Sequence, residues 1–232
     1  MEHLFYAPDI ITDSTLPEEE SQHCVRVLRR REGDPITLTD GKGMLYTAVL
    51  LEAHPKHCRC SITEKIQQNP CWNFNLHIAV APTKNMDRME WFVEKATEIG
   101  VNHITFLRCR YSERHEIKLH RLYKIAVSAM KQSGQTTLPR IHEMIDFNDF
   151  ITYPFDGRKL FGHCESGKTA LLQDPYPSGR NVLVLIGPEG DFSREEINNA
   201  IASDFLPVSF GPHRLRTETA AIIACHTFHL IN

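Results

Sequence analysis

The sequence has no apolar run approaching the roughly 20 residues that a membrane-spanning helix needs. Its start, MEHLFYAPDI, lacks a basic segment followed by an apolar stretch, so we expect no secretory signal peptide. A disulfide framework is also unexpected, because the seven cysteines are odd in number and irregularly spaced. These absences predict a cytoplasmic protein with reduced thiols and no membrane contact.

Several motifs of catalysis and binding are missing as well. No G-x-G-x-x-G opens a strand–helix–strand unit, which argues against a conventional dinucleotide or Rossmann methyl-donor site. No serine occupies the hydrolase pattern G-x-S-x-G. His54, His57, Cys58 and Cys60 are close in sequence, but no second pair of ligands has a matching spacing, so we expect no metal ion.

The net charge of −3 gives no overall attraction to nucleic acid, so the distribution of charge is more informative. The stretch SQHCVRVLRRR at 21–31 carries four arginines and no acid. One interpretation is a solvated helix end, where basic residues complement the helix dipole. The other is a phosphate-binding patch, because three adjacent arginines exceed what a helix end requires.

Residues 1–70 are predicted to form a small, strand-rich domain. A helix is expected over 17–29, and the turn DGKG at 40–43 indicates a hairpin between two strands. Periodicity is lost over 66–73, which we interpret as the linker. Small size, strands and a run of arginines favour an RNA-binding β-barrel.

Residues 74–232 alternate strand and helix patterns, which predicts an α/β domain with a parallel sheet covered by helices. Ser193 and Glu196 form a capping box at the start of one helix. The last helix, over 218–229, is apolar nearly all round, so we expect it to be buried. The expected strands are 76–81, 103–107, 138–141, 159–162, 181–186 and 206–210.

The segment GHCESGKT at 162–169 fits the phosphate-loop pattern G-x-x-x-x-G-K-[ST] at every fixed position. That pattern needs a long helix after it. Only ALLQD separates Thr169 from Pro175, so any helix there is short. A phosphate-loop nucleotide hydrolase, in which Lys168 would contact phosphate, is therefore the weaker alternative.

Two glycine turns follow strands of this domain, at the strand ends where open α/β sheets bind ligands. The first is GPEG at 187–190; the second contains Gly211, Arg214 and Arg216, with Glu218 at a helix start. Glycine permits positive φ and a close approach of ligand to backbone. Ordinary turns and surface charges explain either motif alone, but the two together favour a ligand site.

Four stretches together resemble one protein family: KNMDRMEWFVEKATEIGV, AMKQSGQTTLPRI, LVLIGPEGDFSREEI and SFGPHRLRTETAA. They are similar to those of the bacterial small-subunit ribosomal RNA uracil-N3 methyltransferases, which belong to the SPOUT superfamily of knotted methyltransferases. The resemblance spans essentially the whole chain, and the ordered motifs GPEG and R-x-E-T-A make it specific. Three residues depart from the family pattern: Asp191 replaces a glycine, Lys131 replaces an acid and Gln135 replaces an arginine.

This resemblance implies a PUA-like β-barrel that binds RNA, followed by an α/β domain whose last part threads a trefoil knot. It also implies a homodimer that modifies 16S ribosomal RNA. Because the net charge is negative, we expect the target to be the assembled 30S subunit over free RNA. The implied cofactor is S-adenosylmethionine, held by three loops after three late strands. The implied cofactor-binding residues are His163, Glu165, Ile186, Gly187, Pro188, Glu189, Gly190, Ser209, Phe210, Gly211 and Leu215.

The implied reaction is methyl transfer to N3 of a uridine, whose pairing edge must be unpaired or flipped out of the stack. Loss of the N3 proton spreads negative charge onto the flanking carbonyl oxygens, so a cation there stabilises the transition state. We assign this role to Arg216, with Arg214 as the weaker candidate. Glu218 or Glu189 would accept the proton or hold the arginine.

Arg26, Arg29 and Arg30 are predicted to contact RNA phosphates, and we extend RNA binding to Lys84 and Gln132. Two other functions stay open at this point. One is a knotted methyltransferase that modifies a different nucleotide, in ribosomal RNA or in tRNA. The other is an RNA-binding module without catalysis, in which the glycine turns bind no ligand.

Overall fold

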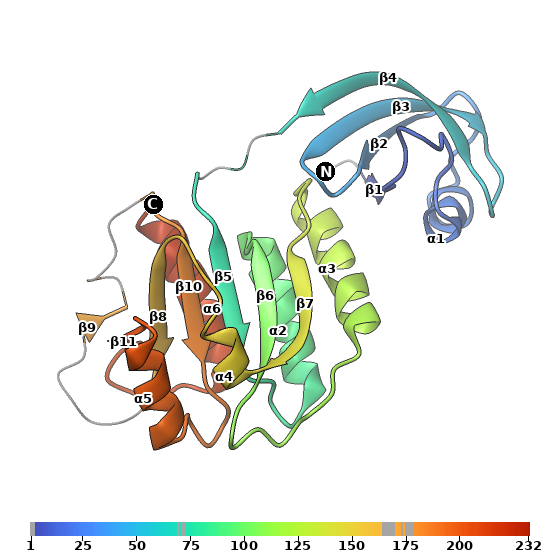
Figure 1. Cartoon of the computed structure of the whole chain (residues 1–232). Helices are drawn as coiled ribbons and strands as arrows, with labels where there is room; N and C mark the ends of the chain where they lie inside the picture. The colour runs from blue at the N-terminus through green and yellow to red at the C-terminus, as the bar shows by residue number, and fades with distance from the viewer. Residues whose placement is uncertain (1–2, 69, 71–72, 164–169, 173, 175–178) are drawn as a thin grey trace. The chain divides into compact units, whose positions relative to one another are not determined.

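The computed structural model describes residues 3–68, 70, 73–163, 170–172, 174 and 179–232 (Figure 1). The chain divides into two compact units. The first comprises Met1–Cys71 and Val127–Leu138, and the second comprises Trp72–Ala126 and Pro139–Asn232. The sequence assigned 127–138 to the second domain, whereas in the structure this segment packs with the first unit.

The first unit is built on a four-stranded sheet in the order β1-β2-β3-β4. Its strands are β1 (Leu4–Tyr6), β2 (Pro35–Thr39), β3 (Met44–Glu52) and β4 (Arg59–Gln67). β1 runs parallel to β2, and the other neighbours are antiparallel. The predicted hairpin joins β2 to β3, and in its turn Asp40 Oδ1 accepts a 2.8 Å hydrogen bond from the Lys42 N–H. A small β unit at the N-terminal side is confirmed, although β1 has no counterpart in the sequence prediction.

The helix of the first unit is shorter than predicted, and its hydrogen-bonding pattern changes from α-helical to π-helical along its length. α1 (Glu18–Gln22) continues into a π-helical turn, η1 (His23–Val27), in which the Leu28 N–H donates to the His23 carbonyl over 3.0 Å. Arg29 then adopts a left-handed backbone with φ of 56°. Because left-handed residues do not propagate a right-handed helix, the helix ends before residue 29.

The core of the first unit holds the inward side chains of the sheet and of the helix. Burial raises the pKa of the Cys24 thiol to about 12, so this cysteine stays protonated and unreactive at neutral pH. The five cysteines within the described residues form no disulfide. The largest contributors to this core are Phe5, Leu16, Leu38, Tyr46 and Leu50.

The segment Val127–Leu138 contains the end of α3 (Leu119–Ser133) and the turn that follows it. Thr39 Oγ1 donates to the Thr136 carbonyl over 3.1 Å. Lys131 Nζ lies 2.6 Å from Glu20 Oε1. Lys131, which departs from the family pattern, therefore belongs to an ion pair of the first unit.

The second unit contains a parallel sheet in the order β7-β6-β5-β10-β8-β11-β9. All six predicted strands are present, and β9 is additional. β7 begins later than predicted, because Pro139 has no N–H to donate to a sheet. The strands are β5 (Leu76–Val80), β6 (His103–Arg108), β7 (Arg140–Asp146), β8 (Arg158–Gly162), β9 (Ala170–Leu171), β10 (Val182–Ile186) and β11 (Leu206–Ser209).

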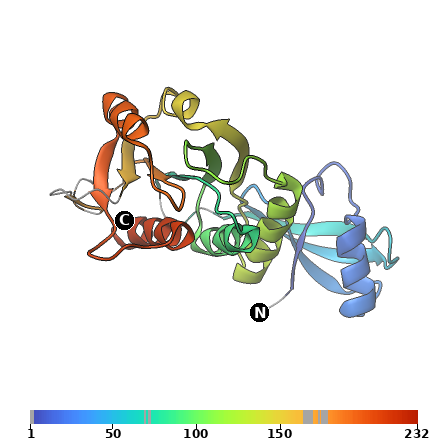
Figure 2. The same cartoon turned by 90° about the horizontal axis from the view of Figure 1, so that it is seen from below.

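Helices cover both faces of this sheet, as Figures 1 and 2 show: α2 and α6 lie on one face, and α4 and α5 lie on the other. Their bounds are α2 (Met86–Ile99), α4 (Phe147–Phe150), α5 (Arg194–Ala202) and α6 (Thr217–Leu230). The predicted capping box begins α5: Ser193 Oγ accepts from the Glu196 N–H, and the Glu196 carboxylate accepts from the Ser193 N–H.

The last helix is buried along much of its length, as its apolar sequence predicts. Ala221, Ala224, Cys225 and Phe228 are fully buried, and Leu230 at its end is exposed. Its inner side packs against α2 and the central strands β5 and β10. No helix within the described residues is both long and apolar enough to cross a membrane.

Candidate active site

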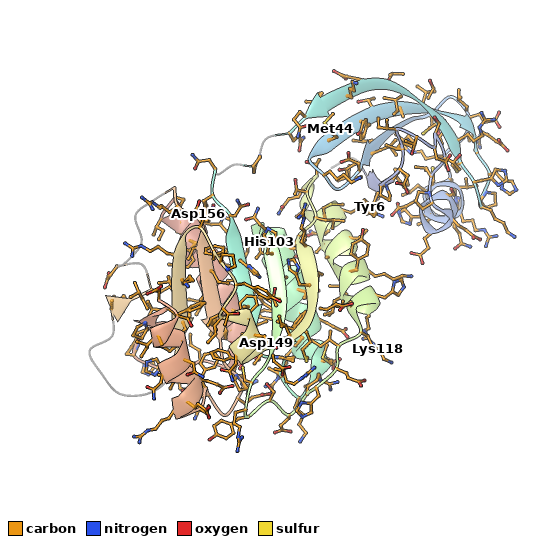
Figure 3. The ribbon with its side chains drawn as sticks, viewed as in Figure 1. Tyr6, Met44, His103, Lys118, Asp149 and Asp156 are labelled. Carbon is orange, nitrogen blue, oxygen red and sulfur yellow. The ribbon has the colours of Figure 1, made fainter. Side chains whose placement is uncertain are left out.

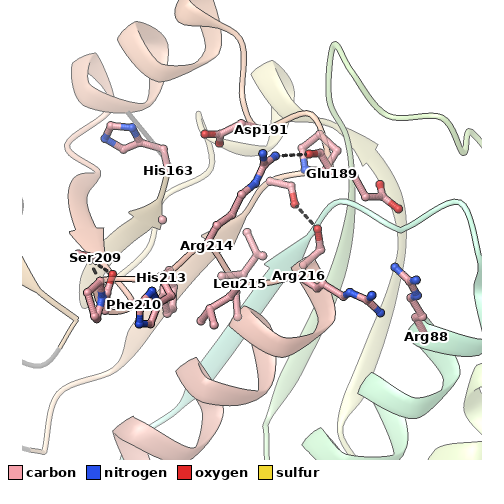
Figure 4. Close-up of a pocket in the computed structure, with 18 residues that line it drawn as sticks. Arg88, His163, Glu189, Asp191, Ser209, Phe210, His213, Arg214, Leu215 and Arg216 are labelled. Atoms are coloured by element: carbon pink, nitrogen blue, oxygen red, sulfur yellow. Dashed lines mark hydrogen bonds between the residues drawn. The ribbon is translucent and has the colours of Figure 1, made fainter. Parts of the chain in front are cut away.

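A cavity of about 590 Å³ lies in the second unit, where the chain leaves β8, β10 and β11 (Figure 4). This position fits the rule that ligands of open parallel sheets bind at the carboxyl ends of strands. The cavity is lined by Arg88, Gly162, His163, Ile186, Gly187, Pro188, Glu189, Asp191, Ser209, Phe210, Gly211, Pro212, His213, Arg214, Leu215, Arg216, Thr217 and Ala220.

Glycine is required at two points of the cavity wall. A Cβ added at Gly162 would overlap the ring of Phe210, because the ring lies directly against this glycine. Gly211 has φ of 122°, a left-handed backbone that residues with a side chain rarely adopt. A side chain at either position would therefore disturb the wall of the cavity.

The two glycine turns are joined by hydrogen bonds. Thr217 Oγ1, in the first turn of α6, donates to the Gly187 carbonyl over 3.1 Å. The Arg214 guanidinium donates to the Glu189 carbonyl over 2.8 Å, and Figure 4 shows its side chain reaching across to that turn. These bonds tie the two turns together beside the cavity.

Lys84 holds neighbouring loops together at the same end of the sheet. Its N–H donates to Glu189 Oε1 over 3.1 Å, and its carbonyl accepts from the Arg114 guanidinium over 2.7 Å. Its ammonium lies 2.8 Å from Glu113 Oε2. The predicted RNA-binding residue thus has a structural role, and the Glu189 carboxylate already accepts a backbone hydrogen bond.

The start of α6 presents charged residues of both signs. Arg216 is the N-cap residue of this helix, is exposed and lines the cavity. Glu218 lies in the first helical turn and is only 7 % exposed. Its Oε1 lies 3.7 Å from Nε of Arg88, a residue of α2 that the sequence did not single out.

The structure brings most of the predicted cofactor residues together around this cavity. Gly190 and Glu218 do not line it: Gly190 packs against Tyr111, and Glu218 is buried beside Arg88. Glu165 lies outside the described residues, as does 164–169 of the phosphate-loop-like segment. The predicted residues that line the cavity are His163, Ile186, Gly187, Pro188, Glu189, Ser209, Phe210, Gly211, Leu215, Arg214 and Arg216.

Arg88, Asp191 and Thr217 contribute to the site without having been predicted. Asp191 has φ of 66°, a left-handed conformation usual for glycine, which explains how the chain accommodates the family position where glycine is expected. Thr217 occupies the variable position of the R-x-E-T-A motif, so the motif gave no signal for it. No sequence signal pointed to Arg88, because it lies on the polar side of an amphipathic helix.

Arg26, Arg29, Arg30 and Gln132 belong to the first unit. Arg26, Arg29 and Gln132 are exposed, and Arg30 is half-buried, with its N–H donating to the Cys24 carbonyl over 3.1 Å. These side chains therefore lie where a large partner can reach them.

A second cavity, of about 410 Å³, lies on one face of the sheet next to a cluster of histidines. His77 and His142 line it. Nδ1 of His103, a residue labelled in Figure 3, shares a hydrogen bond of 3.1 Å with Nε2 of His142. Burial lowers the pKa of His77 to about 3, with the neighbouring His103 and His142 adding to the effect. Across the described residues, no group of three or more metal-ligating side chains has a geometry that holds a metal ion.

Comparison with known proteins identifies the family. Residues 70–229 match the family described as an RNA methyltransferase domain, and residues 16–63 match an RNA methyltransferase PUA domain. The chain belongs to this RNA methyltransferase family. Its parallel sheet and N-terminal β unit have the SPOUT methyltransferase and PUA folds that the sequence motifs implied.

Individual relatives of this RNA methyltransferase extend the likeness to both units. The ribosomal RNA small subunit methyltransferase E of Bacillus subtilis (strain 168) is 28 % identical over 89 % of this chain and 85 % of its own length. A crystal structure of a probable rRNA-methyltransferase from Porphyromonas gingivalis is 42 % identical, with a TM-score of 0.95 and coverage of 99 % and 98 %. The small subunit methyltransferase E of Neisseria gonorrhoeae, crystallised with S-adenosyl methionine, is 28 % identical, with a TM-score of 0.86 and coverage of 100 % and 98 %.

Proposed function

We propose that this RNA methyltransferase transfers the methyl group of S-adenosylmethionine to N3 of a uridine in 16S ribosomal RNA. The observation that carries the proposal is the cavity between two glycine turns, with Arg216 and the start of α6 at its wall. Membership of the RNA methyltransferase family supports the reaction class. The likeness to small subunit methyltransferases E supports the RNA target.

The cavity has the features that a sulfonium nucleoside needs. Its volume of about 590 Å³ lies within the range of small-ligand sites. Gly187 and Gly211 bring backbone to the cavity wall, and Phe210 and Leu215 supply apolar surface. When bound, S-adenosylmethionine supplies a methyl group already activated by its positive sulfur, so no metal ion is required for the transfer.

The side chains at the start of α6 account for the rest of the chemistry. The N3–C bond forms as the C–S bond breaks, while the N3 proton leaves the base. Arg216 stabilises the negative charge that spreads onto the uracil oxygens. Glu189 accepts the proton in preference to Glu218, because Glu189 lines the cavity and Glu218 is buried outside its lining.

The first unit supplies the contact with RNA in this proposal. Exposed Arg26 and Arg29, with Arg30 beside them, bind phosphates and set the orientation of the RNA without reading its sequence. Gln132 of the first unit and Lys84 of the second unit add contacts to the same substrate. Because the net charge is −3, we expect selectivity for the folded 16S RNA in the assembled 30S subunit over free RNA. We further propose a cytoplasmic homodimer with domain limits of 1–70 and 74–232.

Arg216→Ala tests the proposal. Removing a cation that stabilises transition-state charge lowers the rate of transfer by about 100- to 1,000-fold. The dissociation constant for S-adenosylmethionine, measured by calorimetry, stays within about twofold of wild type. Arg121→Gln is the matched control, because Arg121 pairs with Glu90 at 2.6 Å and does not line the cavity. Full activity of Arg216→Ala on 30S subunits would overturn the assignment.

A further inference from the structure

The second cavity, of about 410 Å³ and lined by His77 and His142, is separate from the active-site cavity, and we call it the histidine cavity. Within the described part of the chain, the two cavities share no lining residue. His77 and Leu183 pair across β5 and β10, and each is the second residue of its strand. The active-site cavity instead lies where strands end. The histidine cavity is therefore not an extension of the cofactor site.

The segment between α4 and β8 forms an aromatic wall of the histidine cavity. Phe150, Tyr153 and Phe155 line it, and Figure 1 shows this segment crossing the same face of the sheet as α4. Phe150 packs edge-on against His77, with 5.6 Å between ring centroids, and Tyr153 packs edge-on against Phe150 at 6.4 Å. Phe150 is buried, whereas Tyr153 is 56 % exposed. Tyr153 therefore offers an accessible ring to a planar ligand that enters from solvent.

The imidazoles of this cavity are uncharged at neutral pH. His77 Nε2 lies 2.8 Å from Thr105 Oγ1, and His142 Nε2 lies 3.1 Å from His103 Nδ1. Burial lowers the pKa of His77 to about 3, and it also lowers the pKa values of His103 and His142. Neutral imidazoles donate and accept hydrogen bonds but provide no charge to hold an anion. Aromatic walls with neutral hydrogen-bonding groups fit an uncharged heteroaromatic ring such as a nucleobase.

The edge strand β7 adds charged groups of both signs. Glu143 lines the cavity and is exposed, so its carboxylate can accept a hydrogen bond from an exocyclic amino group. Arg140 is also exposed, and its charge contributes to the lowered pKa values of His103 and His142, which places its guanidinium near these rings. An arginine beside a base pocket is suited to contact a phosphate. These groups match a nucleotide of adenine, cytosine or guanine, the bases with an amino group, better than one of uracil.

We propose that the histidine cavity binds an unpaired adenine, cytosine or guanine of the RNA substrate, at a nucleotide other than the methylated uridine. The inference rests on the proposed function, which makes 16S ribosomal RNA the substrate. Sequence-specific recognition of RNA takes unstacked bases onto tyrosine and histidine rings and reads their edges by hydrogen bonds. The base stacks on Tyr153, its amino group donates to Glu143, and Arg140 contacts its phosphate. This contact anchors the RNA on the second unit and takes no part in methyl transfer.

Removing the tyrosine ring tests the contact with RNA. Loss of one base stack is expected to weaken binding of Tyr153→Ala to 30S subunits by roughly 5- to 100-fold. The kcat at saturating subunits and the affinity for S-adenosylmethionine stay at their wild-type values, and the cofactor affinity shows that the second unit is folded. Tyr153→Phe keeps the ring and is expected to bind 30S subunits as wild type does. Tyr123→Ala, at an exposed tyrosine of α3 that lines neither cavity, is the matched control.

A titration with nucleotides tests the cavity without methyl transfer. The full-length protein, with S-adenosylmethionine saturating the active site, is titrated with millimolar monophosphates of adenosine, cytidine, guanosine and uridine. The ring-proton NMR signals of His77 and His142, assigned with His77→Gln and His142→Gln, are expected to shift with the first three nucleotides and less with uridine monophosphate. Glu143→Gln is expected to remove this preference, because an amide donates as well as accepts hydrogen bonds.

The outcomes separate this inference from its alternatives. Binding of Tyr153→Ala to 30S subunits as tight as that of wild type would overturn it, and a shift of the histidine signals with nucleotides would then make the cavity a site for a free nucleotide. Histidine signals that shift with none of the four nucleotides would overturn the assignment of a nucleobase. If the wild-type protein binds S-adenosylmethionine but transfers no methyl group to 30S subunits, the proposed function itself fails, whereas the nucleotide titration still decides whether the cavity binds a base.

Discussion

The two units of this RNA methyltransferase carry positive charge in different settings. In the second unit, Arg88, Arg214 and Arg216 line a cavity together with residues of two glycine turns. In the first unit, Arg26 and Arg29 are exposed on a helix and directly after it. A cavity selects a small ligand by shape, whereas exposed arginines contact phosphates of any sequence. Cofactor binding and RNA binding should therefore respond to different substitutions.

The largest expected effect concerns the cavity. Gly162→Val places a side chain in the space of the Phe210 ring, which must then move toward the ligand site. Overpacking of this kind lowers the free energy of unfolding by about 1–3 kcal/mol, and the displaced ring obstructs the cavity, so we expect the affinity for S-adenosylmethionine to fall. RNA binding by the first unit is unaffected. Calorimetry and a filter-binding assay on 30S subunits measure the two properties.

The smaller side chain of Phe210→Leu supplies the control for that experiment. In the double variant, Phe210→Leu makes room for the methyl groups that Gly162→Val adds. We therefore expect the double variant to regain part of the cofactor affinity that Gly162→Val loses. An unchanged affinity in Gly162→Val alone would show that the Phe210 ring does not define the cavity wall.

The complementary substitution removes charge from the first unit. Replacing Arg26, Arg29 and Arg30 together by glutamine is expected to weaken binding to 30S subunits and to reduce the slope of log affinity against log salt by about 2–3, because each phosphate contact contributes roughly 0.7–0.9. Cofactor affinity stays at the wild-type value. Lys56→Gln, at an exposed turn of the same unit, is the single-charge control. A salt slope equal to wild type in the triple variant removes these arginines from the RNA interface.

Stability of the first unit depends on the ion pair between Lys131 and Glu20, which the alternation of strands and helices in the sequence did not predict. Lys131→Met leaves the Glu20 carboxylate, whose side chain is 11 % exposed, without its cation at 2.6 Å. Unpairing a mostly buried charge is expected to lower the free energy of unfolding by about 1–3 kcal/mol, after allowance for the partial exposure of Lys131. Urea denaturation measures the loss, and adding Glu20→Gln should restore most of it. If Lys131→Met is as stable as wild type, the pair contributes nothing.

A further expected effect is a pH dependence of stability that arises from His77 in the second unit. Because the pKa of His77 is lowered to about 3 in the folded protein from an ordinary 6.5, the unfolded chain binds more protons between these values. Stability is therefore fully present above about pH 6.5 and falls as the pH drops toward 3, by up to about 1.4 kcal/mol per pH unit. His77→Gln should flatten this dependence, whereas His120→Gln, at an exposed site, should not. Equal slopes for wild type and His77→Gln would contradict the account.

The parts of the structure that the sequence predicted are those fixed by local signals. The capping box at Ser193, the hairpin turn at 40–43 and the strands that end in glycine turns all depend on residues a few positions apart. The fold as a whole was predicted from the motif resemblance, because periodicity alone indicates a parallel sheet but not the way the chain passes through it.

The parts that were missed depend on contacts between distant residues. The end of α3 continues the same amphipathic pattern as its beginning, so nothing in the sequence shows that Val127–Leu138 packs with the first unit. The π turn at His23–Val27 has no composition signal of its own. Arg88 acquires its position beside Glu218 only because α2 and α6 pack side by side.

The most direct test of the central claim is mass spectrometry of 16S ribosomal RNA from a strain that lacks this protein. The account predicts that one N3-methyluridine disappears, returns when the wild-type gene is restored, and stays absent when only Arg216→Ala is supplied. A methyluridine that persists without the protein, or that returns with the Arg216→Ala variant, would contradict it.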